Sequence, residues 1–320
     1  MSDPDLAASL PAPISSRVVS GRLTDGRAVV VCDVSGMSAP QRTDLEAAVK
    51  DAIGAREDVT EVHVALTSER TQRRIIAIGS GKGGVGKSTL TANLAIALAR
   101  GGMKVGLVDA DIYGPSQPLI LGNQGDKPVA EDNKLVPVPS RHGVPVLSMG
   151  HLVEPGRALA WRGPMAGNAL TQLIDAHWGN AELLLVDLPP GTGDVQLTMM
   201  QRFKPAGAVL VSTPQDLALI DAVRAGQLFD QAGVPIIGLV ENMAGYACPH
   251  CGEVSDPFGT GGVEQAAGRL DLPFLGRIPL DLEIRQGSDR GVPPAAGDGD
   301  LAAPFRAIAA KVREWLSENG

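Results

Sequence analysis

The spacing of hydrophobic residues changes near residue 73 and divides the chain into two parts. Before that point, apolar and polar residues alternate over short stretches, as in strands with one solvent-exposed face. After it, continuous apolar runs are separated by helical stretches, which is typical of parallel strands buried on both faces. The expected buried strands cover 75–80, 104–111, 144–150, 183–190, 208–213 and 235–243. This pattern predicts an α/β fold, with a mostly parallel sheet and helices on both faces.

The part before residue 73 predicts a small N-terminal α+β domain. Residues 17–36 contain two strands joined by a Thr-Asp-Gly turn, which is a hairpin signal. A helix is expected next, with Thr43 and Glu46 as a capping box at its start. Its apolar residues recur at helical spacing, at Leu45, Val49 and Ile53. Residues 59–66 alternate again and predict a third strand.

We expect three segments along the chain. Residues 1–16 contain three prolines and are predicted to be a disordered leader. Residues 17–72 form the small domain and end in a polar, charged linker, and residues 73–320 form the large domain. Cys32 lies on an expected strand of the small domain, and we interpret it as a core residue.

Composition narrows the possible functions. The chain has 320 residues, 44% of them hydrophobic, which is enough for one large core and a small appendage. Its formal net charge is −8, and no run of Lys and Arg suggests nucleic-acid binding. There are no eighteen consecutive apolar residues, and the acidic N-terminal stretch does not resemble a secretory signal. We therefore expect a cytoplasmic protein that binds neither nucleic acid nor membrane.

A phosphate-binding loop follows the first buried strand. The segment "GSGKGGVGKSTL" at 79–90 has the P-loop spacing Gly-x-x-x-x-Gly-Lys-Ser and precedes a helical stretch, as this motif requires. Lys87 is expected to reach the β- and γ-phosphates of ATP, and Ser88 is expected to bind Mg²⁺. Inward-facing backbone N–H groups and the helix N-terminus complete the anion site. The expected nucleotide-binding residues are Gly81, Lys82, Gly83, Gly84, Val85, Gly86, Lys87, Ser88 and Thr89.

A second lysine, Lys82, stands at the start of the loop. With it, "KGGVGKS" resembles the deviant Walker A motif of the MinD, ParA and nitrogenase iron protein class. That resemblance implies a lysine that crosses a dimer interface to the nucleotide of the partner, in the manner of an arginine finger. The alternative is an ordinary solvated loop lysine.

Aspartates end two of the buried strands. Asp187 follows four apolar residues and fits the Walker B position, which holds Mg²⁺ directly or through water. Gly191 and Gly193 make the next loop suitable for sensing the γ-phosphate. Asp111 is the candidate for positioning the attacking water, and Asp109 competes for this role. The resemblance favours Asp111, the second aspartate of "DAD".

The base-binding end of the site is less defined by the sequence. Asn242 follows a buried strand, so that its amide is a candidate partner for the edge of adenine. The segments 212–216 and 278–281 are similar loops at strand ends. In "WRGPM" at 161–165, Arg162 either meets a phosphate or packs its stem.

A Cys-Pro-His-Cys segment is the remaining candidate for chemistry. Cys248 and Cys251 are too few for a complete metal site, and Cys32 lies over two hundred residues upstream. On its own the segment fits an iron–sulfur cluster, a zinc ion or a redox dithiol. His250 is interpreted as a turn residue rather than a ligand.

Several motifs in a fixed order resemble one family. They are "GKGGVGKSTL", "DADIYGPS", "WRGPM", "DLPPGTGD", "STPQD", "ENMAGYACPHCG" and "GRIPLD". Together they closely resemble the Mrp/ApbC iron–sulfur cluster carrier ATPases over about residues 73–320. Residues 17–67 are similar to the iron–sulfur assembly domain often fused to them, although the loop before the helix lacks the cysteine common in such domains.

The resemblance implies a homodimer that binds a [4Fe–4S] cluster. Cys248 and Cys251 from each of two chains would supply four thiolates on a two-fold axis. The expected function is slow, dimer-dependent ATP hydrolysis coupled to cluster transfer, with iron–sulfur apoproteins and assembly factors as partners.

Two alternative functions stay open. A zinc ion bridging the dimer would use the same thiolates. A MinD- or ParA-like positioning ATPase would act on membrane or DNA, and the amphipathic stretch 303–319 is a candidate membrane helix. Packing of that helix on the sheet is the commoner arrangement.

Overall fold

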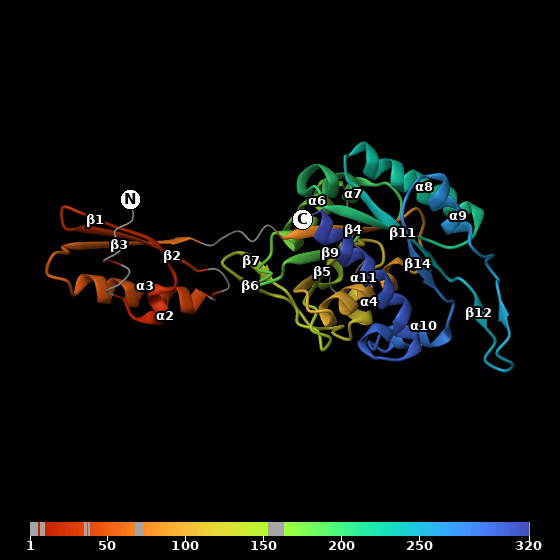
Figure 1. Cartoon of the computed structure of the whole chain (residues 1–320), viewed down its shortest axis with the longest axis horizontal. Coiled ribbons are helices and arrows are strands. Elements are labelled where there is room, and N and C mark those ends of the chain that lie inside the picture. Colours follow the sequence, from red (N-terminus) through yellow and green to blue (C-terminus); the bar gives the residue numbers. More distant parts are fainter. Residues whose placement is uncertain are drawn as a thin grey trace. The chain divides into compact units, whose positions relative to one another are not determined.

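A computed structural model describes residues 6, 10–34, 37, 39–67, 73–152 and 163–319 of the chain. The chain divides into two compact units, residues 1–72 and residues 73–320. Figure 1 labels most of the helices and strands of both units.

The small unit is a three-stranded sheet covered by one long helix. Strand β1 (Val18–Thr24) pairs antiparallel with β2 (Arg27–Asp33), and β2 pairs parallel with β3 (Glu61–Thr67). The parallel pair requires a crossover, which helix α3 (Ala39–Gly54) provides. Cys32 is fully buried in the core of this unit, which confirms its interpretation as a core residue.

Two expectations for the small unit differ from the structure. Helix α3 begins at Ala39, so that Thr43 and Glu46 lie inside it and do not form a capping box. Glu46 instead pairs with Lys50, one helical turn further on. Within the expected disordered leader, α2 (Ala12–Ser15) is helical, Leu6 and Leu10 are buried in the unit's core and Ile14 packs against that core; residues 1–5 and 7–9 lie outside the described residues.

The large unit is built on a seven-stranded sheet in which all strands are parallel. Its order is β14-β11-β10-β4-β9-β5-β8. The strands are β4 (Arg74–Ser80), β5 (Val105–Asp109), β8 (Val146–Ser148), β9 (Leu183–Asp187), β10 (Gly207–Ser212), β11 (Ile236–Asn242) and β14 (Phe274–Ile278). This sheet confirms the predicted α/β fold, and six of its strands lie where the sequence predicts them.

Helices cover both faces of this sheet, as Figure 1 shows. One face packs against α4 (Lys87–Arg100), α5 (Gln117–Ile120), α10 (Leu282–Asp289) and α11 (Ala303–Glu318). The other packs against α6 (Gly163–Ile174), α7 (Asp194–Thr198), η2 (Met199–Phe203), α8 (Asp216–Gln231) and α9 (Gly262–Arg269). Alternate residues of each central strand enter opposite cores, so both faces must be apolar.

Short elements complete the unit. They are β6 (Val129–Glu131), β7 (Lys134–Val136), η1 (Met149–His151), β12 (Tyr246–Ala247), β13 (Val254–Ser255), η3 (Pro294–Ala296) and η4 (Asp300–Ala302). Strands β12 and β13 form a separate antiparallel hairpin, which projects from the sheet in Figure 1.

The apolar face of the C-terminal helix is buried in the protein. Phe305, Ile308, Val312 and Leu316 of α11 are at most 1% exposed and belong to the core that α4 shares. This packing removes the surface that a membrane-bound helix would need. No helix in the described part of the chain has the length and apolar character to cross a bilayer.

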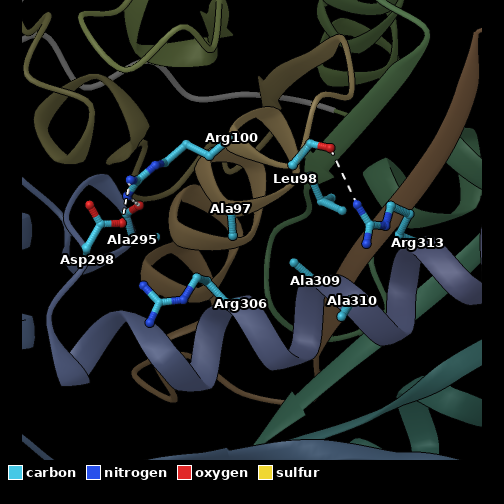
Figure 2. A pocket seen from close by; sticks show the side chains of 10 residues that line it. Ala97, Leu98, Arg100, Ala295, Asp298, Arg306, Ala309, Ala310 and Arg313 are labelled. Atoms are coloured by element: carbon cyan, nitrogen blue, oxygen red, sulfur yellow. Dashed lines mark hydrogen bonds and ion pairs between the residues drawn. The ribbon is translucent and has the colours of Figure 1, made fainter.

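A hollow of about 310 Å³ lies between α11 and the C-terminal end of α4. Figure 2 shows the alanines and arginines that line it, with Ala97 and Ala309 between Arg100, Arg306 and Arg313. Arg100 donates to the carbonyl of Ala295 at 3.0 Å and pairs with Asp298, and Arg313 donates to the carbonyl of Gly101 at 3.4 Å. The two arginine side chains thus donate to backbone carbonyl groups at the ends of η3 and α4, which lack partners within those helices. The hollow is at the opposite end of α4 from the P-loop.

Candidate nucleotide and metal sites

The P-loop occupies the turn from β4 into α4. Gly84 and Gly86 have φ angles of +77° and +81°, a region that favours glycine. A Cβ atom on Gly86 would lie 2.0 Å from Nδ2 of Asn242, so this position also lacks space for a side chain. The loop therefore needs its glycines for backbone conformation and for close packing on β11.

A cavity of about 430 Å³ opens over this loop. It is lined by residues 82–89 of the loop and by Asp111 and Asn242. The segment at 278–281 also reaches it, through Pro279, Leu280 and Asp281. The N-terminus of α4 points its free N–H groups into this region, which suits a bound phosphate.

Lys87, which lines the cavity, forms a buried ion pair with Asp187. The Lys87 side chain is 6% exposed and that of Asp187 is fully buried. The ammonium group contacts Oδ1 of Asp187 and lies 3.9 Å from Oδ2 of Asp111. Thr91 donates to the same Asp187 Oδ1 at 3.3 Å. The structure thus brings together three of the residues that the sequence predicts for the site.

The residues fit a magnesium ion bound together with nucleotide phosphates. Mg²⁺ keeps several waters and uses one or two protein oxygens beside phosphate oxygens, so Ser88 and Asp187 are a sufficient set. Nowhere in the described ranges do three or more His, Cys, Asp or Glu side chains gather to form a complete protein site.

The two aspartates after β5 have different surroundings. Asp109 is fully buried and accepts hydrogen bonds from the backbone of Asp111 (3.2 Å) and Gln117 (3.1 Å) and from the Ser148 hydroxyl (2.9 Å). Asp111 lines the cavity. The geometry therefore favours Asp111 for contact with nucleotide or water.

Burial raises the pKa of Asp109 to about 7, and the nearby charge of Asp187 adds to this rise. Hydrogen bonds from Gln117 and Ser148 and the charge of Lys87 act in the opposite direction. Asp109 is thus a buried acceptor that organises the loop after β5.

Two predicted contact residues are bonded within the chain. Lys82 is partly buried, and its Nζ donates to Oε1 of Gln215 at 3.2 Å. Asn242 donates from Nδ2 to the carbonyl of Val85 at 2.7 Å, so one of its two amide N–H groups holds the loop, and the other N–H and Oδ1 are the atoms that could meet a base. Asp281 caps α10 by accepting from the backbone of Glu283. Trp161 and Arg162 lie outside the described residues.

The predicted metal cysteines lie in the turn of the β12–β13 hairpin. Cys248 is half-buried and Cys251 is exposed. The hairpin is closed by hydrogen bonds from the backbone of Cys248 to Glu253 (2.9 Å) and of Gly252 to Cys248 (2.8 Å). Both cysteines therefore belong to the turn of a projecting hairpin, whose strand β12 is labelled in Figure 1.

The turn also activates one thiol. Hydrogen bonds lower the pKa of Cys248. The largest effect comes from the backbone N–H of Cys251, the next from the backbone N–H of His250, and a smaller one from the Cys251 thiol. Burial raises the pKa of Cys32, by contrast. The thiolate is the form that binds metals and reacts. Cys248 at the hairpin is therefore better suited to metal binding than the buried Cys32.

Comparison with known proteins matches residues 71–313 to the family described as ParA: NUBPL iron-transfer P-loop NTPase. This chain belongs to that family. Two curated relatives are similar to this chain. An Arabidopsis thaliana "Iron-sulfur protein required for NADH dehydrogenase, mitochondrial" is 51% identical over 221 residues, 68% of this chain and 70% of the relative. An "Iron-sulfur cluster carrier protein" of Pseudomonas fragi is 43% identical over 266 residues, 79% of this chain and 92% of the relative.

A solved structure supports the fold of the large unit. A nucleotide-binding protein from Archaeoglobus fulgidus in complex with ADP is 39% identical, with a TM-score of 0.62. The match covers 71% of this chain and 90% of that protein. The predicted resemblance to the iron–sulfur carrier ATPases is therefore confirmed at the level of the family.

Two contacts near the nucleotide site were not predicted from the sequence. Gln117 is buried and contacts Asp187, and Gln215 contacts Lys82. Gln215 lies within the strand-end loop 212–216, which the sequence did indicate. Gln117 carried no such signal, because it follows a turn and precedes a proline rather than ending a strand.

Proposed function

We propose that this protein binds ATP with Mg²⁺, hydrolyses it slowly as a homodimer, and carries a [4Fe–4S] cluster that it transfers to apoproteins. The curated relatives whose names mention iron–sulfur proteins or cluster carriers support this proposal. The observation that carries it is the accessible pair of cysteines on a hairpin of a P-loop NTPase, with Cys248 half-buried and Cys251 exposed.

The cysteine pair has the properties of half a cluster site. Cys248 and Cys251 are both accessible, and the lowered pKa of Cys248 favours the thiolate that binds iron. A cubane cluster needs four thiolates, and one chain supplies two at this hairpin. A two-fold dimer contributes the same surface twice, so it completes the set. Because such a cluster lies between subunits, rearrangement of the dimer would release it.

The nucleotide site supports slow hydrolysis that depends on the dimer. Lys87, Ser88 and Asp187 would bind the phosphates and Mg²⁺, and Asp111 would position the attacking water. Lys82 is held by Gln215 of its own chain. Catalysis would require Lys82 to leave this partner and reach the nucleotide of the other subunit.

The proposal is tested by metal analysis after anaerobic reconstitution with iron and sulfide. The expected content is about four irons and four sulfides per dimer, from the four-thiolate rule. Cys248→Ala and Cys251→Ala should each lose the cluster and still bind ATP. Cys32→Ala is the matched control, because this buried thiol lies in the other unit. Iron and sulfide at the wild-type ratio in both hairpin variants would contradict the bridging site.

Two alternatives predict other results. One zinc per dimer with no uptake of iron would indicate a zinc-bridged ATPase instead of a carrier. A positioning ATPase would co-sediment with liposomes or bind DNA. The buried apolar face of α11 does not favour the membrane form, and that function leaves the cysteine pair unexplained.

A further inference from the structure

We infer that Gln117 is a positioning residue of the metal–nucleotide site, which orients the Asp187 carboxylate toward the phosphates. This inference rests on the proposed binding of ATP with Mg²⁺. Gln117 is the first residue of α5 and its side chain is fully buried, although it carries two polar atoms. Its Oε1 has no hydrogen-bond partner among the described residues, so the cost of burying this amide is offset by the hydrogen bonds of its nitrogen.

The amide nitrogen of Gln117 joins the two residues that would hold the metal. Nε2 donates to Oδ2 of Asp187 at 2.8 Å and to the backbone carbonyl of Ser88 at 3.0 Å. Both partners are acceptors only, so the amide must point its nitrogen toward them. The orientation of the side chain is thereby fixed by its surroundings.

The two oxygens of Asp187 have different partners. Oδ1 is bonded to Lys87 and Thr91, and Oδ2 is bonded to Gln117. When Lys87 moves to a nucleotide phosphate, the bond from Gln117 remains on Oδ2. It holds the carboxylate in place and leaves Oδ1 facing the position that Lys87 vacates. Hydrogen bonds to metal-binding carboxylates orient them for the metal in this way.

The backbone of Gln117 links this carboxylate to the loop that carries Asp111. Its N–H donates to Oδ2 of Asp109 at 3.1 Å, while Oδ1 of Asp109 accepts from the N–H of Asp111 at 3.2 Å. Asp109 thus holds both ends of segment 111–117, and Gln117 connects that segment to Asp187. A movement of the Asp187 carboxylate would therefore shift the loop that carries Asp111.

The test is the Mg²⁺ dependence of nucleotide binding in Gln117→Met, which keeps the side-chain length and removes both polar atoms. Binding of a fluorescent ADP analogue is measured in EDTA and at increasing Mg²⁺ concentration. We expect unchanged affinity in EDTA and a roughly 10- to 100-fold higher Mg²⁺ requirement, the usual effect of removing such a partner. Gln117→Ala, which cannot overpack, is measured in parallel.

Asn123→Leu is the matched control. This buried amide lies just beyond α5, and its Nδ2 donates to the carbonyl of Pro139 at 3.3 Å, away from the metal residues. It should keep the wild-type Mg²⁺ dependence at a comparable loss of thermal stability. A wild-type Mg²⁺ requirement in either folded Gln117 variant overturns this inference and leaves the proposed metal–nucleotide function standing. If the wild-type protein itself shows no Mg²⁺-dependent binding, the proposed metal–nucleotide function fails as well.

Discussion

The ammonium group of Lys87 is ion-paired with the carboxylate of Asp187, and both side chains are almost completely removed from solvent. A buried pair of this kind is costly to break from one side, because the remaining charge has no partner. Lys87, the proposed nucleotide-binding lysine, thus also neutralises the buried charge of Asp187 when no nucleotide is bound. Its replacement should therefore lower the stability of the protein independently of ATP binding.

Lys87→Ala should lower the free energy of unfolding of the nucleotide-free protein by about 3–5 kcal/mol, because Asp187 is left buried and uncompensated. Adding Asp187→Asn should restore part of this loss, since the unpaired charge disappears. Urea denaturation measures both effects. Lys104→Ala is the control: its pair with Glu182 is about half exposed on each side and should cost about 0–1 kcal/mol. Additive losses in the double variant would show that the charges are not coupled.

Lys82→Ala should keep nucleotide affinity and reduce turnover by about a thousandfold or more, as expected for a cation supplied by a partner subunit. Gln215→Leu removes the contact that holds Lys82 within its own chain, and it should retain turnover because the lysine remains. Equilibrium binding and phosphate release measure the two properties. If Lys82→Ala loses binding to the same extent as Lys87→Ala, Lys82 acts on the nucleotide of its own chain.

Asp109 should make the stability of the metal-free protein fall as pH rises from about 4 to about 7. Its pKa is raised from 3.8 to about 7 in the folded state, so the folded protein holds a proton there that the unfolded chain has lost. Above pH 7 both states are ionised and the full penalty is present. Urea denaturation across this range should give a smaller pH-dependent decline in Asp109→Asn than in the wild type. Equal slopes would mean that Asp109 is ionised throughout.

The three thiols should react at very different rates with an alkylating reagent. Cys248 should react first at neutral pH, because its pKa is lowered and it is accessible, and Cys251 is also exposed. Cys32 should react only in denaturant, since it is fully buried and burial raises its pKa. Peptide mass spectrometry after timed alkylation assigns each site. Alkylation of Cys32 at the rate of Cys251 in the folded protein would contradict its place in the core.

The sequence predicts the central sheet well because its strands are continuous apolar runs buried on both faces. Strand β14 has only five residues, including Gly276 and Arg277, and gives no such run. In the small unit, Thr43 looks like a helix cap only when the preceding segment is taken as coil. The helix begins earlier, so tertiary packing outweighs the local signal there.

At the candidate site, spacing alone places Lys87, Ser88 and Asp187, because the ends of parallel strands converge at one edge of the sheet. Spacing does not reveal which partner a side chain selects. Gln215 and Gln117 contact residues more than sixty positions away in the sequence. Such pairings depend on the folded arrangement and are accessible only from the structure.

The close approach of Gly86 to Asn242 bears on how experiments at the two sites should be interpreted. Any side chain at position 86 would collide with the last residue of β11, and only five residues separate Asn242 from Cys248. A Gly86 substitution would therefore disturb the root of the cysteine hairpin as well as the phosphate loop, and a loss of iron in it would have two explanations. Lys87 contacts β9 instead, so replacing it disturbs the phosphate loop and Asp187 without touching the root of the cysteine hairpin.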